Sequence, residues 1–236
     1  MRHGGNASFG ADERLHPPAC PGKDAPMHDE RILASPACMA EGAGFLARRE
    51  PRFAHALELC GPPPLRRRED GFAALMQAIV SQQVSTAAAR AIMARLQAAG
   101  LDGPQAIASA EDDAMRAAGL SRQKMRYLRA LAEADLDFIA LRSAPAEAVS
   151  AELTALPGIG RWTAEIYAMF SLGRADVFAP ADLALQEATR LLFELPERPR
   201  EAALRRMAEG WSPWRTVAAG MLWAYYHHAK KREGIG

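Results

Sequence analysis

Lysine is scarce in this chain of 236 residues: it occurs only at positions 23, 124, 230 and 231, and arginine supplies the other strongly basic side chains. The formal net charge is only +1. Overall charge therefore gives no sign of a general nucleic-acid binder. Any affinity for a polyanion must come from local features of the chain.

Cysteine is also rare. Cys20, Cys38 and Cys60 are odd in number, widely spaced and confined to the first 60 residues. They form no metal-binding spacing with one another, so we expect reduced thiols and no metal site.

Long apolar runs are absent. No run approaches the roughly 20 residues needed to cross a bilayer, and the N-terminus lacks the contiguous apolar segment of a signal peptide. Residues 1–30 are rich in Gly, Pro, His and charge without periodicity, which predicts a disordered extension. We expect a cytoplasmic protein that makes no membrane contact.

The alternation of apolar and polar residues that marks β-strands is missing too, and the apolar residues recur at helical spacing. The fold class we predict is all-α. Ser85, Ser109 and Ser121 are expected to cap helices. The predicted helices cover roughly residues 72–80, 87–99, 109–119, 121–134, 143–155, 161–171, 183–193, 200–210 and 214–230.

A tight turn follows the helix that is expected to end near Leu156. Pro157 and Gly158 break that helix, Ile159 offers one apolar plug, and Gly160 begins the next helix without a side chain. This pattern predicts a helix-hairpin-helix. The backbone N–H groups of such a turn point outward together and the helix dipole adds positive charge, so the turn can hold a phosphate.

Asp182 ends the segment Val-Phe-Ala-Pro-Ala-Asp just before a predicted helix. The plain interpretation is an N-cap, because Asp is among the commonest capping residues. A second interpretation is compatible with the first. Gly173 turns the chain back toward the hairpin, and a charged carboxylate there could stabilise positive charge on a sugar.

Four segments, in this order, resemble the helix-hairpin-helix DNA glycosylases, most closely the DNA-3-methyladenine glycosylase II group. They are Ala-Ile-Val-Ser-Gln-Gln-Val-Ser (78–85), Leu-Pro-Gly-Ile-Gly-Arg-Trp-Thr-Ala (156–164), the Asp182 segment, and Trp-Ser-Pro-Trp-Arg (211–215). The resemblance implies two helical lobes with a DNA-binding cleft between them. One lobe would combine residues 31–71 and 190–236, and the other would carry the hairpin on residues 72–189. Relatives often begin with a β-domain, for which this chain has neither room nor pattern.

The same resemblance implies roles for individual residues. Asp182 matches the catalytic aspartate, and Trp162 and Trp223 match positions that line the base pocket. The tyrosine expected one helical turn after Trp162 falls on Ile166, with Tyr167 next to it, so both are candidates for the pocket wall. Trp211 and Trp214, by contrast, are expected to pack in the core.

Two further groups of residues are implied to contact DNA. Gln83 would enter the duplex as the intercalating plug, with Gln82 its neighbour facing the DNA. The phosphate-binding hairpin would comprise Pro157, Gly158, Ile159, Gly160, Arg161 and Thr163.

The expected reaction is hydrolysis of the N-glycosidic bond of alkylated bases of the 3-methyladenine and 7-methylguanine type. These bases are already cationic, so they leave without protonation and one carboxylate can suffice. Relatives that also cut the strand use a lysine directly after the hairpin, and here that position is Trp162. We therefore expect a monofunctional enzyme that leaves an abasic site during base excision repair. Lys124, on another helix, is expected to face DNA or solvent.

Relatives with a four-iron cluster hold it with four closely spaced cysteines near the C-terminus, which this chain lacks, so no iron-sulfur cluster and no other cofactor is expected. Backbone carbonyls of the hairpin are candidates for binding a monovalent cation. The expected partner is double-stranded DNA containing damaged bases, bound by a monomer.

Two alternatives remain open. A helix-hairpin-helix protein that only binds DNA would keep Gly158 and Gly160 without needing Asp182 and the two tryptophans. A glycosylase for deaminated or oxidised bases would need additional protonating or hydrogen-bonding groups in its pocket.

Overall fold

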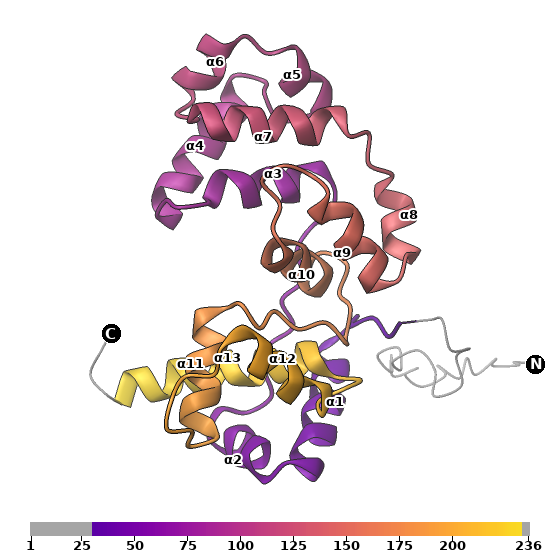
Figure 1. Cartoon of the computed structure of the whole chain (residues 1–236), viewed down its shortest axis with the longest axis vertical. Helices are drawn as coiled ribbons and strands as arrows, with labels where there is room; N and C mark the ends of the chain where they lie inside the picture. Colours follow the sequence, from indigo (N-terminus) through magenta and orange to yellow (C-terminus); the bar gives the residue numbers. More distant parts are fainter. Residues whose placement is uncertain (1–29, 233–236) are drawn as a thin grey trace, which may run out of the picture.

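The computed structural model describes residues 30–232, and this part of the chain is helical (Figure 1). Its only β-type pairing is an isolated antiparallel bridge between Ile32 and Arg174, so the all-α prediction is confirmed for the described residues. The extension predicted at residues 1–30 lies, apart from its last residue, outside the described range. The helices are α1 (Pro36–Arg49), α2 (Pro51–Cys60), α3 (Phe72–Ser81), α4 (Thr86–Ala98), α5 (Pro104–Ser109), α6 (Asp112–Ala117), α7 (Arg122–Glu133), α8 (Phe138–Ser143), α9 (Ala146–Thr154), α10 (Arg161–Phe170), α11 (Leu183–Leu192), α12 (Glu201–Glu209) and α13 (Arg215–Arg232).

Two of the three serine caps form as predicted. The Ser85 hydroxyl accepts a hydrogen bond from the backbone N–H of Ala88 at 3.2 Å, and that of Ser121 accepts one from Lys124 at 3.3 Å. Each hydroxyl satisfies one of the N–H groups that have no acceptor within the first turn of a helix.

Two predicted helix starts are wrong. Ser109 is the last residue of α5, where its hydroxyl donates to a carbonyl of its own helix, and α6 begins only after Glu111. The helix predicted over residues 143–155 begins only at Ala146, after Pro145, because Ser143 is the last residue of the preceding helix α8. A residue that precedes proline is disfavoured in helical conformation, and this forces the break.

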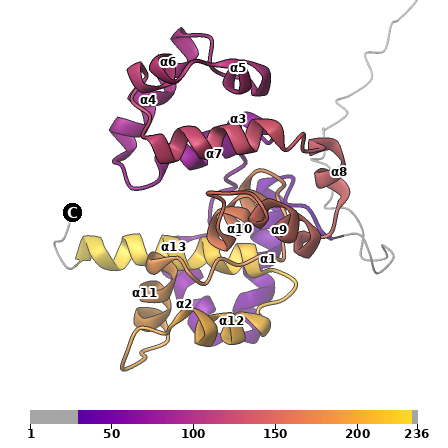
Figure 2. The ribbon, with the colours of Figure 1, turned by 45° about the horizontal axis from the view of Figure 1, so that its top comes forward.

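The helices pack around two apolar cores. Figures 1 and 2 show α3 to α7 grouped on one side, α1, α2 and α11 to α13 on the other, and α9 and α10 between them. Buried side chains of α3 to α9 and part of α10 form the first core. Those of α1, α2, α11, α12 and α13, with the rest of α10, form the second, in which Trp211 and Trp214 are 5% and 3% exposed, as predicted for core tryptophans.

The boundary between the lobes differs from the predicted one. We placed residues 72–189 in one lobe, but the buried residues of α11 belong to the core of the terminal helices. Helix α10 serves both cores: Ala164 and Tyr167 face one, and Ala168 and Met169 face the other. The change of lobe therefore occurs within α10 rather than after residue 189, because two neighbouring faces of this helix are apolar and meet different cores.

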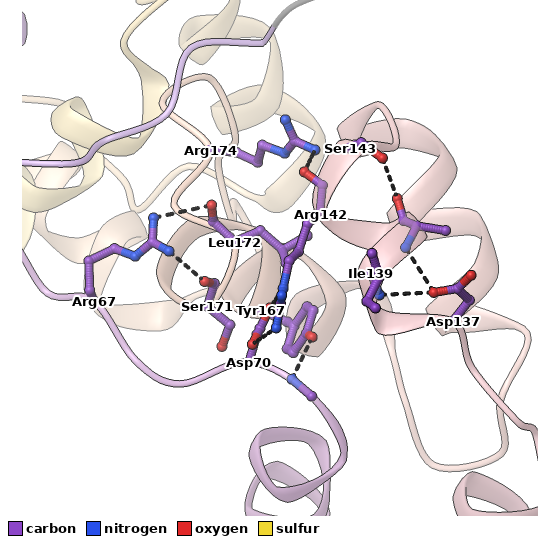
Figure 3. Close-up of polar contacts among 12 residues, drawn as sticks. Arg67, Asp70, Asp137, Ile139, Arg142, Ser143, Tyr167, Ser171, Leu172 and Arg174 are labelled. Carbon is purple, nitrogen blue, oxygen red and sulfur yellow. Dashed lines mark hydrogen bonds and ion pairs between the residues drawn. The ribbon is translucent and has the colours of Figure 1, made fainter. Parts of the chain in front are cut away.

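Arginine side chains fasten the junction between the lobes by binding backbone carbonyls at helix ends (Figure 3). Arg67 donates to the carbonyls of Ser171 and Leu172, just past the end of α10, at 3.0 and 3.2 Å. Arg174, only 4% exposed, donates to the carbonyls of Arg142 and Ala144 at the end of α8. The last carbonyls of a helix have no intrahelical donor, so these contacts satisfy them.

Among the described cysteines, Cys60 is a free thiol, as expected. Over residues 30–232, no helix is both long and apolar enough to span a membrane.

Gly42 provides a test of the packing between α1 and α13. A Cβ atom added at Gly42 would lie 2.6 Å from the Trp214 ring and 2.8 Å from a Val217 methyl group. We expect Gly42→Ala to lower the free energy of unfolding, measured with urea, by about 1–3 kcal/mol through overpacking.

Gly44→Ala on the same helix is the matched control. Its added Cβ would meet only the mobile end of Arg48, at 3.4 Å. We expect this variant to be neutral or more stable by up to about 1 kcal/mol, because alanine favours helix. Equal losses for both variants would contradict the packing described.

Candidate active site

Asp182 is the N-cap of α11 and receives three N–H groups. Its Oδ1 accepts a hydrogen bond from the backbone N–H of Leu185 at 3.0 Å and from the indole Nε1 of Trp223 at 3.3 Å, and its Oδ2 accepts from the indole Nε1 of Trp162 at 3.3 Å. The predicted cap is confirmed, and the half-buried carboxylate keeps acceptor sites unused, because two carboxylate oxygens offer about four.

The two tryptophans reach Asp182 from different lobes. Trp162 is the second residue of α10 and is 43% exposed, whereas Trp223 comes from α13 and is partly buried. The Trp223 ring packs on Phe170, with ring centroids 5.6 Å apart and planes 32° apart. The fold thus brings three of the predicted site residues, Asp182, Trp162 and Trp223, into direct contact, with Phe170 as an aromatic neighbour that the sequence reasoning missed.

A groove of about 780 Å³ lies beside Trp162, lined by α3, α4 and α10. Ile166 and Tyr167 both contribute to its wall, but they differ in burial. Tyr167 is only 4% exposed, and its hydroxyl accepts a hydrogen bond from the backbone N–H of Gly71 at 3.0 Å. Ile166, partly buried on the same helix as Trp162, is therefore the more available of the two candidates for the wall of the groove.

The hairpin has the geometry expected of its sequence. Gly158 has φ +89°, a value that favours glycine, and Gly160 is the N-cap of α10. The Ile159 side chain is buried as the apolar plug. The first N–H groups of α10 have no acceptor within the helix, so they are available to a phosphate.

The side chains of the predicted hairpin differ in their exposure. Thr163 is 8% exposed, so its side chain is largely covered. The Arg161 guanidinium turns back to the Glu165 carboxylate at 3.1 Å. Thr163 is therefore covered, whereas the Arg161 side chain stays 52% exposed although it is paired with Glu165.

Glu165 is a buried carboxylate that sequence reasoning did not find. It is 5% exposed and binds Arg161 on its own helix and Arg205 on α12, at 3.1 and 3.0 Å, while its second oxygen has no partner. Burial raises the pKa of this carboxyl above its usual range, and the two arginines only partly oppose the shift. The Arg161–Glu165 pair has the local i,i+4 spacing of a helix, but no local pattern signals Arg205, which is 40 residues away in the sequence.

The two glutamines before α4 differ in their exposure and in their contacts. Gln83 is exposed and has φ +56°, a left-handed conformation at the tip of the turn. Gln82 is half-buried, and its side-chain Nε2 donates to the carbonyl oxygen of Gly158 in the hairpin at 2.8 Å. Gln83 is therefore the exposed residue of the pair, whereas the Gln82 amide faces the hairpin.

Lys124 is held against the protein. Its Nζ donates to the carbonyl oxygen of Val80 at 2.7 Å, and desolvation lowers the pKa of the ammonium group.

Leu183, the residue directly after Asp182 in the sequence, is 62% exposed. Helical periodicity alone did not predict that this leucine is exposed.

Comparison with known proteins places the chain in a family. Residues 76–213 match the HhH-GPD superfamily base excision DNA repair proteins. The chain belongs to this family of helix-hairpin-helix DNA repair glycosylases.

Individual relatives agree with that assignment. DNA-3-methyladenine glycosylase 1 of Schizosaccharomyces pombe is 34% identical over 165 residues, which cover 66% of this chain and 72% of the yeast protein. DNA-3-methyladenine glycosylase 2 of Escherichia coli is 33% identical over 168 residues, covering 65% of this chain and 57% of the bacterial protein.

Solved structures are similar over most of the fold. The crystal structure of a DNA-3-methyladenine glycosidase from Bacillus halodurans has a TM-score of 0.74 and 33% identity, covering 86% of this chain and 94% of that one. The 3-methyladenine DNA glycosylase of S. pombe, solved in complex with abasic DNA, has a TM-score of 0.67 and 29% identity, covering 78% of this chain and 95% of the other.

Glu165 generates a prediction about pH. Because the folded pKa is raised above the ordinary 4.5, the folded protein holds this proton more tightly than the unfolded chain. The contribution of Glu165 to the free energy of unfolding is therefore largest below pH 4.5 and declines as pH rises through the folded pKa.

Urea unfolding of wild type and Glu165→Gln between pH 4 and 7 measures this effect. We expect the stability of wild type relative to the variant to fall across that range. A difference that moves in favour of wild type as pH rises would show that the two arginines outweigh the burial of the carboxylate.

Proposed function

We propose that this chain is a monofunctional DNA glycosylase that flips alkylated purines out of double-stranded DNA and hydrolyses their N-glycosidic bond, leaving an abasic site for base excision repair. The observation that carries the proposal is the Asp182 carboxylate, held by the Leu185 backbone and by two indole N–H groups beside a helix hairpin. The relatives named as 3-methyladenine glycosylases support the choice of substrate.

The proposed role of Asp182 is electrostatic. Departure of a base leaves positive charge on the sugar, and a fixed carboxylate stabilises that charge. The three N–H groups orient Asp182 before substrate binds, so little reorganisation is needed when the charge develops. The same carboxylate can position the water that attacks the sugar.

The proposed role of the aromatic residues is to select the base. A methylated purine such as 3-methyladenine or 7-methylguanine carries positive charge, and an indole face attracts a cation by about 0.5–2 kcal/mol. Trp162 is exposed enough to offer its face, and Trp223 extends the aromatic surface through Phe170. A cationic base also needs no proton from an acid to leave.

The hairpin and Gln83 would handle the DNA itself. The N–H groups of the Gly158 to Gly160 turn are proposed to bind backbone phosphate, and Gln83 is proposed to fill the space that the flipped nucleotide leaves. One molecule supplies the carboxylate, both indoles and the hairpin, which supports action as a monomer. We propose that it acts in the cytoplasm and needs no metal cofactor.

Asp182→Asn tests the role of the charge. Asparagine is also a good N-cap, so the variant should keep the start of α11. It loses the negative charge and the second acceptor oxygen, which Trp162 Nε1 uses in wild type. We expect the single-turnover rate of 3-methyladenine release from alkylated duplex DNA to fall by about 100-fold or more.

Asp135→Asn is the matched control, since Asp135 is exposed and has φ 44°, which asparagine tolerates. Release by this variant should equal wild type. Release by Asp182→Asn at the wild-type rate would exclude the proposed role. Parallel assays on uracil-containing and hypoxanthine-containing duplexes separate this function from removal of deaminated bases.

Borohydride trapping tests whether the enzyme cuts the strand. A lyase forms a Schiff base between an amine and the sugar, and borohydride reduces it to a stable adduct. Trp162 occupies the position of the lysine in such relatives, and Lys124 is engaged by Val80. We therefore expect no covalent adduct during base release, whereas an adduct that disappears in Lys124→Met would make Lys124 the nucleophile.

A further inference from the structure

The turn between α3 and α4, residues 82–85, is called the plug loop here. Gln82 is its first residue and the C-cap of α3, where its backbone N–H donates to the Ile79 carbonyl at 3.2 Å. Its side chain crosses to the hairpin, where Nε2 donates to the Gly158 carbonyl oxygen at 2.8 Å. This hydrogen bond joins the plug loop to the hairpin, 76 residues apart in the sequence, and the proposed function places both on DNA.

The peptide group that Gln82 binds is held at both ends. Its oxygen, on Gly158, accepts from Gln82, and its N–H, on Ile159, donates to the Leu156 carbonyl at 3.1 Å. Because a peptide unit is planar, two hydrogen bonds at opposite ends fix its orientation. The direction of the N–H groups that follow, at Gly160 and Arg161, depends on that orientation.

Helix α7 contacts the hairpin and the end of α3. The Tyr127 ring lies against Gly158 so closely that a Cβ atom there would be 2.3 Å from Tyr127 Cδ2. Three residues earlier on the same helix, Lys124 Nζ donates to the Val80 carbonyl at 2.7 Å, next to the end of α3. The hairpin, the end of α3 and α7 are therefore connected pairwise.

From these contacts we infer that Gln82 is a positioning residue that couples the plug loop to the phosphate-binding hairpin. The Gln82 side chain stays on Gly158 instead of entering the duplex, and only Gln83 inserts. Binding of phosphate by the hairpin then sets the place from which Gln83 enters the DNA. This inference rests on the proposed function for its consequence on DNA, but the coupling itself is a property of the free protein.

Two variants remove the donor while keeping the shape of the side chain: Gln82→Glu and Gln82→Met. Gln83→Glu makes the same change at the neighbouring residue, and Gln105→Glu, at an exposed site on α5, is the distant control. Thermal unfolding of each variant verifies the fold. If Gln82→Glu fails to fold, Gln82→Met carries the test.

The first readout is amide hydrogen exchange of the DNA-free protein. We expect the Ile159 N–H to exchange about 3–10-fold faster in both Gln82 variants, in line with the loss of one hydrogen bond, and at the wild-type rate in Gln83→Glu and Gln105→Glu. Unchanged exchange in the Gln82 variants would overturn the coupling. This readout needs no catalysis.

The second readout separates DNA binding from base release. We expect Gln82→Met to weaken binding of an undamaged duplex about 3–10-fold and also to lower the single-turnover rate of 3-methyladenine release. If Gln82→Met lowers the release rate while duplex affinity and exchange stay at wild-type values, Gln82 acts by insertion and the inference is wrong. Faster exchange and weaker duplex binding in an enzyme that releases no alkylated base would support the coupling and refute the proposed function.

Discussion

The Asp182 carboxylate, bound by one backbone N–H and two indole N–H groups, is the interaction on which the rest of the site depends. Its donors come from α11, α10 and α13, so the carboxylate is correctly held only when these three helices meet. The two cores and the junction between them therefore fix the relative positions of α10, α11 and α13. They place a negative charge beside aromatic faces and within reach of a hairpin that can hold DNA.

Helix α10 connects the hairpin, which is proposed to bind DNA, with the Asp182 site, which is proposed to act on the base. Its first turn carries the hairpin N–H groups and Trp162, its middle carries Ile166 and Tyr167, and its two faces pack into different cores. The carbonyls at its C-terminal end are fixed by Arg67 and the carboxylate in its second turn by Arg205. These contacts fix α10 in its second turn and just past its C-terminal end, so the helix is a rigid support for Trp162 and Ile166.

Most local features of this structure could be predicted from sequence, although the starts of α6 and α9 were not. Contacts between distant residues could be predicted only where the family resemblance supplied them, as for Asp182 with Trp162 and Trp223. The hairpin, the Asp182 cap and the all-α fold follow from turn residues, capping residues and helical periodicity, which act over a few positions. The contacts of Gln82 with Gly158 and of Glu165 with Arg205 join residues 76 and 40 positions apart, and no local pattern encodes them. The lobe boundary was misplaced for the same reason, since apolar periodicity does not tell which core a face meets.

The most direct test of the account compares two sugar mimics in the same DNA duplex, a cationic pyrrolidine and a neutral tetrahydrofuran at the site of the missing base. A carboxylate that stabilises a sugar cation should bind the charged mimic more tightly, by about 10-fold or more, as enzymes do for analogues of their transition states. The account predicts this preference in wild type and its loss in Asp182→Asn. Equal affinity of wild type for both duplexes, or a preference that persists in Asp182→Asn, would contradict it.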